Sequence, residues 1–277
     1  MDPVKVREHF DRIGHFRILV IGRSNAGKTT ILQRVCNTTE LPEIFNTKGE
    51  KARTFTALWA HYFIPPHQLT KYSQRGYHDI EDELIFRSNP GFIFHDSRGF
   101  EAGSDNELRS MKKFVAERAT AMKLEKRIHA IWFCIPMTEC ERPIVAAEEK
   151  FFNECNTAHV PVIVVLTKAD AIESLAIGQL RDEGFTMKEA IQRVKESAAH
   201  MLSKLKMRIE TQLAGCKYPP KDCMNEDHAD CNALLRCTTN ALDEEELQKL
   251  VISTQQVNFV LNIEYAKIMS LGCQIAS

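Results

Sequence analysis

Short runs that are apolar at nearly every position alternate along this chain with longer segments of helical periodicity. The apolar runs cover residues 16–21, 92–94, 130–135, 160–166 and 233–235. Strands that are covered on both faces are hydrophobic at consecutive positions, as in a parallel sheet between two layers of helices. A further strand, antiparallel at one edge, is expected at residues 58–64 or 80–86. The order of strands and helices predicts a doubly wound α/β sheet.

Capping signals mark where several helices begin. Ser104 with Glu107 predicts a helix to about residue 122, and Pro143 predicts one to about residue 155. Thr186 with Glu189 opens a long helix. Its apolar positions recur in steps of three and four and predict one buried stripe, namely Met187, Ile191, Val194, Ala198, Leu202, Leu205, Ile209 and Leu213. Residues 242–269 are expected to form the last helix or pair of helices.

The composition is that of a soluble globular protein. The 277 residues are 44% hydrophobic and 26% charged, and 36 Lys+Arg against 37 Asp+Glu give a net charge of -1. This balance argues against bulk electrostatic binding to nucleic acid or anionic lipid. Residues 1–15 lack the apolar core of a signal peptide, and no apolar run approaches the ~18 residues of a membrane span. We therefore expect a cytoplasmic protein that has its nine cysteines reduced and does not associate with membranes.

No internal repeat or low-complexity linker divides the chain. The expected organisation is an N-terminal tail at residues 1–15 and a single domain at residues 16–270. Two segments, at about residues 47–77 and 171–232, are interpreted as insertions in that domain.

Residues 22–30, GRSNAGKTT, fit the phosphate-loop pattern G-x-x-x-x-G-K-[ST] between an apolar run and a helix-like segment. Glycines let backbone N–H groups converge on an anion, and the following helix points its positive end at it. Lys28 is predicted to bind the β- and γ-phosphates, and the Thr29 hydroxyl is predicted to bind Mg²⁺. The predicted phosphate-binding residues of this loop are Gly22, Arg23, Ser24, Asn25, Ala26, Gly27, Lys28, Thr29 and Thr30.

A second motif, D-x-x-G, begins at Asp96, where the run FIFH ends. A carboxylate at the end of a strand beside a phosphate loop can hold Mg²⁺, usually through water. The backbone N–H of Gly99 can then contact a γ-phosphate. The pattern is weak alone, because Asp-Gly turns are common.

A third motif, Thr167-Lys168-Ala169-Asp170, follows the next apolar run and is a variant of N-K-x-D. The Asp170 carboxylate can accept both the N1–H and the exocyclic amino hydrogens of guanine, a pair of donors that adenine lacks. An unpaired buried carboxylate would be costly, so adenine is rejected. The motif favours GTP and GDP over the alternative of an ATPase or kinase.

In this order, the three motifs resemble the G domain of P-loop GTPases of the translation-factor-related class, over about residues 16–260. GRSNAGKT is most similar to ribosome-assembly-type GTPases, and HDIEDELIFRSNPGFIFHDSRGFEAG resembles a group of fungal G-domain proteins. Septins and immune-associated GTPases are more distantly similar. The resemblance implies a mostly parallel six-stranded sheet with helices on both faces, to which this chain adds a helical insertion.

Several positions depart from that family. Thr167 replaces the family's Asn, which predicts the loss of one tether to the phosphate loop. The switch threonine that caps Mg²⁺ is not identifiable among the candidates Thr54, Thr56 and Thr70. The loop that supports guanine is degenerate, and the resemblance assigns it to Thr238 and Thr239, after the expected strand at residues 233–235.

Phe100 stands where Ras-like enzymes carry the Gln that orients the attacking water, so no general base is expected. Catalysis would rest on Lys28, Mg²⁺ and backbone N–H groups. Arg23 and Arg98 are candidate arginine fingers, with solvent exposure as the simpler interpretation. In the family that this chain resembles, an Asn at position 25 accompanies stimulation by K⁺, which assigns Asn25 a catalytic role.

Two functions follow from these motifs. The first is a Mg²⁺-dependent GTPase that acts as a molecular switch, slow without K⁺, dimerisation or an activator. The second is a non-catalytic GTP-binding structural or assembly module of the septin kind. The expected partners are a guanine nucleotide, a second copy through the nucleotide face and an unidentified protein effector.

Other polar clusters receive simpler interpretations. Asp79, Glu81, Asp82 and Glu83 are expected to form a solvated edge rather than a second metal site. The group Cys216, Cys223, His228, Cys231 and Cys237 lacks the tight pairs typical of zinc sites, which favours free thiols. The helix from Thr186 is expected to present a solvated face, with a partner- or membrane-docking surface as the alternative.

Overall fold

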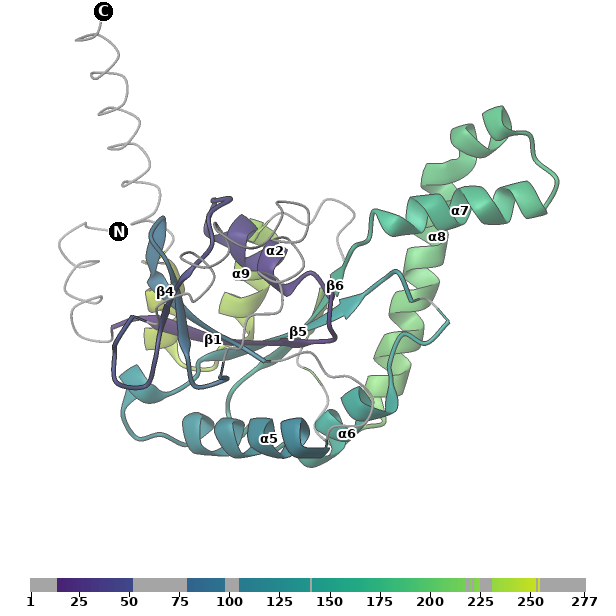
Figure 1. Ribbon diagram of the computed structural model, residues 1–277. Helices are drawn as coiled ribbons and strands as arrows, with labels where there is room; N and C mark the ends of the chain where they lie inside the picture. Colours follow the sequence, from purple (N-terminus) through teal and green to yellow (C-terminus); the bar gives the residue numbers. More distant parts are fainter. Residues whose placement is uncertain are drawn as a thin grey trace, which may run out of the picture.

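A seven-stranded sheet runs through the molecule with helices on both of its faces (Figure 1). The computed structural model describes residues 14–51, 79–97, 105–139, 141–217, 220, 222–224, 231–252 and 254. The strands are β1 (Phe16–Gly22), β2 (Glu43–Phe45), β3 (Glu83–Phe86), β4 (Asn89–Asp96), β5 (Ala130–Pro136), β6 (Val162–Thr167) and β7 (Asp222–Met224). The helices are α2 (Lys28–Val35), α5 (Asp105–Ala119), α6 (Ala146–Glu154), α7 (Ala171–Asp182), α8 (Met187–Ala214) and α9 (Cys231–Ala241), with a 3₁₀ turn at Leu124–Lys126.

The strand order is β2-β3-β4-β1-β5-β6-β7. The five strands from β4 to β7 pair in parallel, whereas β2–β3 and β3–β4 are antiparallel. The carboxyl ends of β1, β4, β5 and β6 therefore meet at one edge of the sheet. In parallel α/β sheets, ligands bind at that edge.

Alternating residues of the strands supply two separate cores. In β1, Leu19 and Ile21 pack with α5, α6 and the C-terminal half of α8, whereas Ile18 and Val20 pack with α2 and α9. Both faces of the central strands are buried, which explains why their sequences are apolar at every position. The predicted α/β class, with a mostly parallel sheet and helices on both faces, is confirmed.

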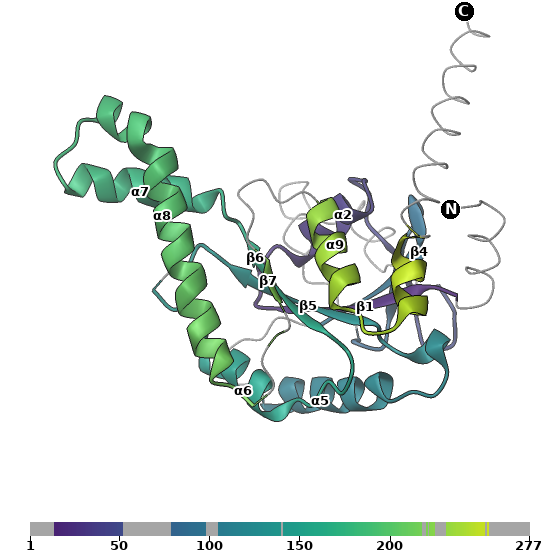
Figure 2. The ribbon, with the colours of Figure 1, turned by 180° about the vertical axis from the view of Figure 1, so that it is seen from behind.

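Helices α7 and α8 form a hairpin that projects from the β6 side of the sheet (Figures 1 and 2). The capping box that predicted the start of α8 is present, because the Thr186 hydroxyl accepts from the N–H of Glu189 and the Glu189 carboxylate accepts from the N–H of Thr186. The predicted stripe is buried only in part. Leu202, Leu205, Ile209 and Leu213 are buried, whereas Met187 and Ile191 are 52% and 56% exposed near the tip.

Four of the predicted strands and the antiparallel strand within residues 80–86 are confirmed. The predicted strand at residues 233–235 is wrong, because this segment lies in α9, where Leu234 and Leu235 pack against the sheet. The short strands β2 and β7 were not predicted, so the sheet has seven strands rather than six. Residues 245–252 of the expected last helix are helical. The alternative edge strand at residues 58–64, Ser104 and residues 255–269 lie outside the described residues.

None of the helices described is both long enough and apolar enough to span a membrane.

Candidate functional site

The phosphate-loop motif forms a tight turn between β1 and α2. Gly22 ends β1, and an added Cβ there would lie 2.6 Å from the carbonyl oxygen of Cys134 on β5. Asn25 and Gly27 adopt the left-handed conformation, with φ of 61° and 79°. These two residues turn the chain into α2, whose N-cap is Gly27. The loop therefore directs the amino end of a helix outward at the carboxyl edge of the sheet, where anions bind.

Lys28 lies folded over its own loop. Its Nζ donates to the carbonyl oxygens of Gly22 and Arg23, each at 3.1 Å. The side chains of Ser24, Asn25, Thr29 and Thr30 are exposed, whereas Ala26 is buried. The ammonium group and the exposed hydroxyls thus lie on the accessible side of the loop, as the predicted phosphate-binding roles require.

Asp96 ends β4 directly beside β1, where it is in register with Val20. Burial raises the pKa of its carboxyl to about 6, and the nearby Lys28 ammonium lowers the pKa only in part. Its Oδ1 is buried without a hydrogen-bond partner, as is the hydroxyl of Ser97 next to it. Because buried polar atoms are almost always satisfied, these two neighbouring orphaned oxygens indicate a place for a ligand.

These residues fit a hydrated Mg²⁺. A hard cation binds carboxylate, hydroxyl and water oxygens, which are the groups that Asp96 and Thr29 offer. The predicted metal residues thus meet the chemical requirement for this ion.

Thr167 ends β6 and touches the phosphate loop. Its Oγ1 donates to the carbonyl oxygen of Ala26 at 2.7 Å, inside the protein. The predicted loss of this tether is wrong, because a threonine hydroxyl at this position reaches the loop as a longer amide would. The Thr167–Asp170 segment is therefore fixed to the loop at residues 22–30 by a direct hydrogen bond.

Lys168 and Asp170 follow at the surface. Lys168 adopts a left-handed conformation with φ of 56°, and Asp170 is the N-cap residue of α7. Both side chains are exposed. The strained residue turns the chain between β6 and α7, and both polar side chains stand at the same edge of the sheet as Lys28. The carboxylate of Asp170 is therefore exposed in this structure, and not buried as the argument from the sequence assumed.

Arg23 is neither exposed nor available as an arginine finger. Its guanidinium forms ion pairs with Glu148 at 2.7 Å and with Glu139 at 2.6 Å, and its side chain is only 8% exposed. These partners raise the pKa of Arg23 despite the opposing effect of burial. Both sequence-based interpretations of its side chain are wrong, because the sequence did not reveal a buried acidic partner on α6.

Thr238 and Thr239 do not form a loop after a strand. Both lie in α9, and each hydroxyl donates to a carbonyl one turn earlier, in Leu234 and Leu235. Thr238 is fully buried and accepts from the indole N–H of Trp132 at 3.0 Å. Its hydroxyl is thus used within the core, and the assignment of these two residues to guanine binding is wrong.

Several predicted residues lie outside the described part of the chain. They are Thr54, Thr56, Thr70, Arg98, Gly99 and Phe100.

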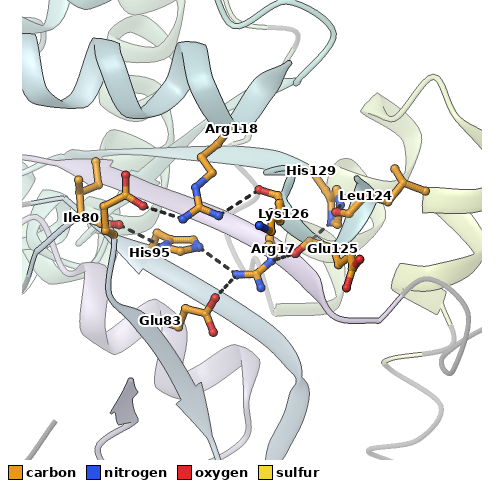
Figure 3. A network of polar contacts seen from close by, with 10 residues as sticks. Arg17, Ile80, Glu83, His95, Arg118, Leu124, Glu125, Lys126 and His129 are labelled. Carbon is orange, nitrogen blue, oxygen red and sulfur yellow. Dashed lines mark hydrogen bonds and ion pairs between the residues drawn. The ribbon is translucent and has the colours of Figure 1, made fainter. Parts of the chain in front are cut away.

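The acidic cluster before and within β3 is engaged in ion pairs (Figure 3). Glu81 pairs with Arg118 of α5, and Glu83 pairs with Arg17 of β1, both at 2.6 Å. His95 lies between them, with Nδ1 3.1 Å from the carbonyl oxygen of Ile80, and burial lowers its pKa to about 3. A neutral His95 that donates from Nδ1 therefore ties the turn before β3 to β4. Glu81 and Glu83 are thus held in ion pairs and do not belong to a fully solvated edge, whereas Asp79 is exposed.

Among the described residues, no group of three or more His, Cys, Asp or Glu side chains could hold a metal ion. Cys216 is buried, and the side chains of Cys223 and His228 are outside the described part.

No protein-family model matches this chain, and no curated protein matches it. Among solved structures, the chain is similar to a septin GTPase domain from Chlamydomonas reinhardtii. The sequence identity is 16%, the TM-score is 0.38, and the match covers 84% of this chain and 71% of the septin chain. An identity this low assigns no function to this protein.

Proposed function

We propose that this protein binds GTP and GDP with Mg²⁺ and hydrolyses GTP slowly, as a molecular switch. One observation carries the proposal. The phosphate loop, the orphaned carboxylate of Asp96 and the Thr167–Asp170 segment stand at the carboxyl ends of β1, β4 and β6, within one edge of one sheet.

The phosphate part rests on the geometry of the loop. When a nucleotide phosphate binds, Nζ of Lys28 would donate to phosphate oxygens instead of to the carbonyl oxygens of Gly22 and Arg23. The backbone N–H groups at the amino end of α2 would donate to the phosphate as well. Charge stabilisation by these groups is the catalytic contribution of the chain itself. A bound Mg²⁺, held by Thr29 and through water by Asp96, would supply further charge neutralisation at the phosphates.

The preference for guanine rests on Asp170. Its exposed carboxylate can accept two parallel hydrogen bonds from guanine, and the stem of Lys168 can lie over the base plane. The Thr167 hydrogen bond to Ala26 supports this assignment, because it would hold the base-binding and phosphate-binding segments at a fixed separation. Asp170→Asn should shift the preference from guanine toward xanthine nucleotides, because the amide can donate to the xanthine oxygen.

The proposal includes K⁺ as an activator beside Asn25, whose side chain is exposed on the outer side of the loop. It also includes self-association through the nucleotide face and a protein effector. These features belong to the P-loop GTPases of the translation-factor-related class that the motifs resemble.

A non-catalytic GTP-binding module is the second candidate, and the identity of residue 100 favours it. Phenylalanine at this position cannot orient an attacking water. In this case the nucleotide would support structure or assembly without turnover.

A single-turnover time course distinguishes the two functions. GTP, with ATP as the control, is incubated with Mg²⁺ and a molar excess of protein in KCl or NaCl at several protein concentrations. We expect hydrolysis of GTP alone at a rate on the order of 10⁻⁴ to 10⁻³ s⁻¹, faster in KCl or at higher concentration. GTP that is bound but not hydrolysed in any condition supports the module instead, and no binding of GTP refutes both.

A further inference from the structure

The side chain of Arg23 takes no part in the proposed chemistry, although it is the second residue of the phosphate loop. Its N–H groups meet five acceptors on another part of the chain. Nε and Nη2 donate to the two oxygens of Glu148 at 2.8 and 2.7 Å, and Nη1 donates to Glu139 at 2.6 Å. Nη2 also donates to the carbonyl oxygens of Pro143 and Arg142, at 2.8 and 3.2 Å. The loop is thereby anchored to α6 and to the segment that precedes it.

Glu148 is the centre of this anchor and is fully buried. Its Oε2 also accepts from the N–H of Val145 at 2.9 Å, so one carboxylate joins the start of α6 to the phosphate loop. A buried ion pair rarely stabilises a protein more than a well-packed apolar pair would. Its bidentate geometry, however, fixes the position and orientation of Arg23.

The anchored residue is also a structural part of the loop. The carbonyl oxygen of Arg23 accepts from the N–H of Ala26 at 3.1 Å and from Nζ of Lys28 at 3.1 Å. A displacement of Arg23 would therefore move the turn that presents the N–H groups and the resting position of the lysine.

The far side of the anchor is itself held in place. Arg208 of α8 donates to the carbonyl oxygen of Glu141 at 3.3 Å, and Lys112 of α5 pairs with Glu154 of α6 at 2.6 Å. Phe151 and Phe152 of α6 are buried in the core beneath the sheet. The phosphate loop is thus tied to a part of the molecule that is fixed by packing.

We propose that Glu148 is a positioning residue for nucleotide binding, which acts through Arg23 to hold the phosphate loop in its binding geometry. The inference rests on the proposed function. It says that the Glu148 carboxylate on α6 holds the phosphate loop in its binding geometry before the nucleotide binds.

The test compares Glu148→Gln with two control variants that leave the anchor intact. Glu149→Gln is the matched change of an exposed carboxylate on the same helix, and Phe16→Leu lowers stability from the buried amino end of β1, away from the phosphate loop. The dissociation constants of GTP and GDP are measured with Mg²⁺ at a temperature where all variants are folded. Hydrogen exchange of residues 24–30 is followed without nucleotide. If Glu148→Gln does not fold, Arg23→Lys takes its place, because it keeps the charge and loses the bidentate geometry.

We expect Glu148→Gln to weaken GTP and GDP equally, by about tenfold, the effect of losing one charge-assisted hydrogen bond. Exchange in the loop should rise in the same variant, while the two controls bind within about twofold of wild type. Equal weakening in Phe16→Leu would overturn the assignment, since stability alone would then explain it. Unchanged exchange and affinity in Glu148→Gln would overturn it too. Failure of the wild type to bind either nucleotide refutes the proposed function itself, while the exchange experiment still tests the anchor.

Discussion

Replacement of Asp96 by Asn should stabilise the nucleotide-free protein and at the same time weaken its binding of Mg²⁺ with GTP. The carboxyl of Asp96 has a pKa of about 6 in the folded chain against an ordinary value of 3.8, and burial is the main cause. At about 1.4 kcal/mol per unit, this shift corresponds to a cost of roughly 3 kcal/mol for keeping the group ionised. Asn removes the charge but keeps a buried polar group, so the expected gain is about 1–2 kcal/mol.

The pH dependence of this gain follows from the sign of the shift. The folded state binds the proton more tightly than the unfolded state, so the penalty on wild type is absent below about pH 3.8 and grows as the pH rises through 6. The stabilisation by Asp96→Asn should therefore be full at pH 8 and small at pH 4.

Urea denaturation with EDTA, at pH 4, 6 and 8, measures this effect. Asp182→Asn is the matched control, since Asp182 is exposed on α7 and its change should cost less than about 0.5 kcal/mol. A second titration measures the affinity for GTP as a function of Mg²⁺ concentration, where Asp96→Asn should require more Mg²⁺. An Asp96→Asn protein that is less stable than wild type at pH 8 would refute the reasoning, because the carboxylate would then have a stabilising partner.

Three further predictions test the local structure. Gly22→Ala should lower the free energy of unfolding by about 2–4 kcal/mol, measured by urea denaturation, because the added Cβ would lie 2.6 Å from the Cys134 carbonyl oxygen. A variant as stable as wild type would contradict this prediction. Thr167→Val should cost about 1–3 kcal/mol in the same assay by leaving the Ala26 carbonyl oxygen unpaired, and Thr167→Ser should recover most of it. Thr186→Ala should destabilise the start of α8 by about 1 kcal/mol, because the capping hydrogen bond to the Thr186 hydroxyl is lost. Hydrogen exchange over residues 187–195 should become faster while the nucleotide affinity stays unchanged. Uniformly faster exchange across the protein would argue against a local effect.

The central strands and the phosphate loop were predictable because their signals are local. A strand buried on both faces must be apolar throughout, and the glycines at positions 22 and 27 occupy conformations or contacts that other residues do not tolerate. Asp96 and Asp170 follow from their place at the ends of such strands. The sequence thus predicted that each of the three motifs stands at the end of a strand, in this order along the chain.

The errors concern contacts between distant residues. A run such as Ala233–Leu235 is equally apolar in a strand and on the buried side of a helix, and only packing against the sheet decides for α9. The pair of Arg23 and Glu148 spans 125 positions, and no spacing rule connects them. The tether from Thr167 to Ala26 spans 141 positions, so it could be found only in three dimensions.

Helix α8 belongs to two different environments along its length. Its 28 residues extend about 42 Å, and the positions Leu202, Leu205, Ile209 and Leu213 are buried in the core. The outer part, with the exposed Met187 and Ile191, belongs to the hairpin with α7. Sequence changes in the outer part are therefore free of the constraints that the sheet imposes on the inner part. The hairpin can therefore change in length by whole turns in both helices while the carboxyl edge of the sheet stays the same.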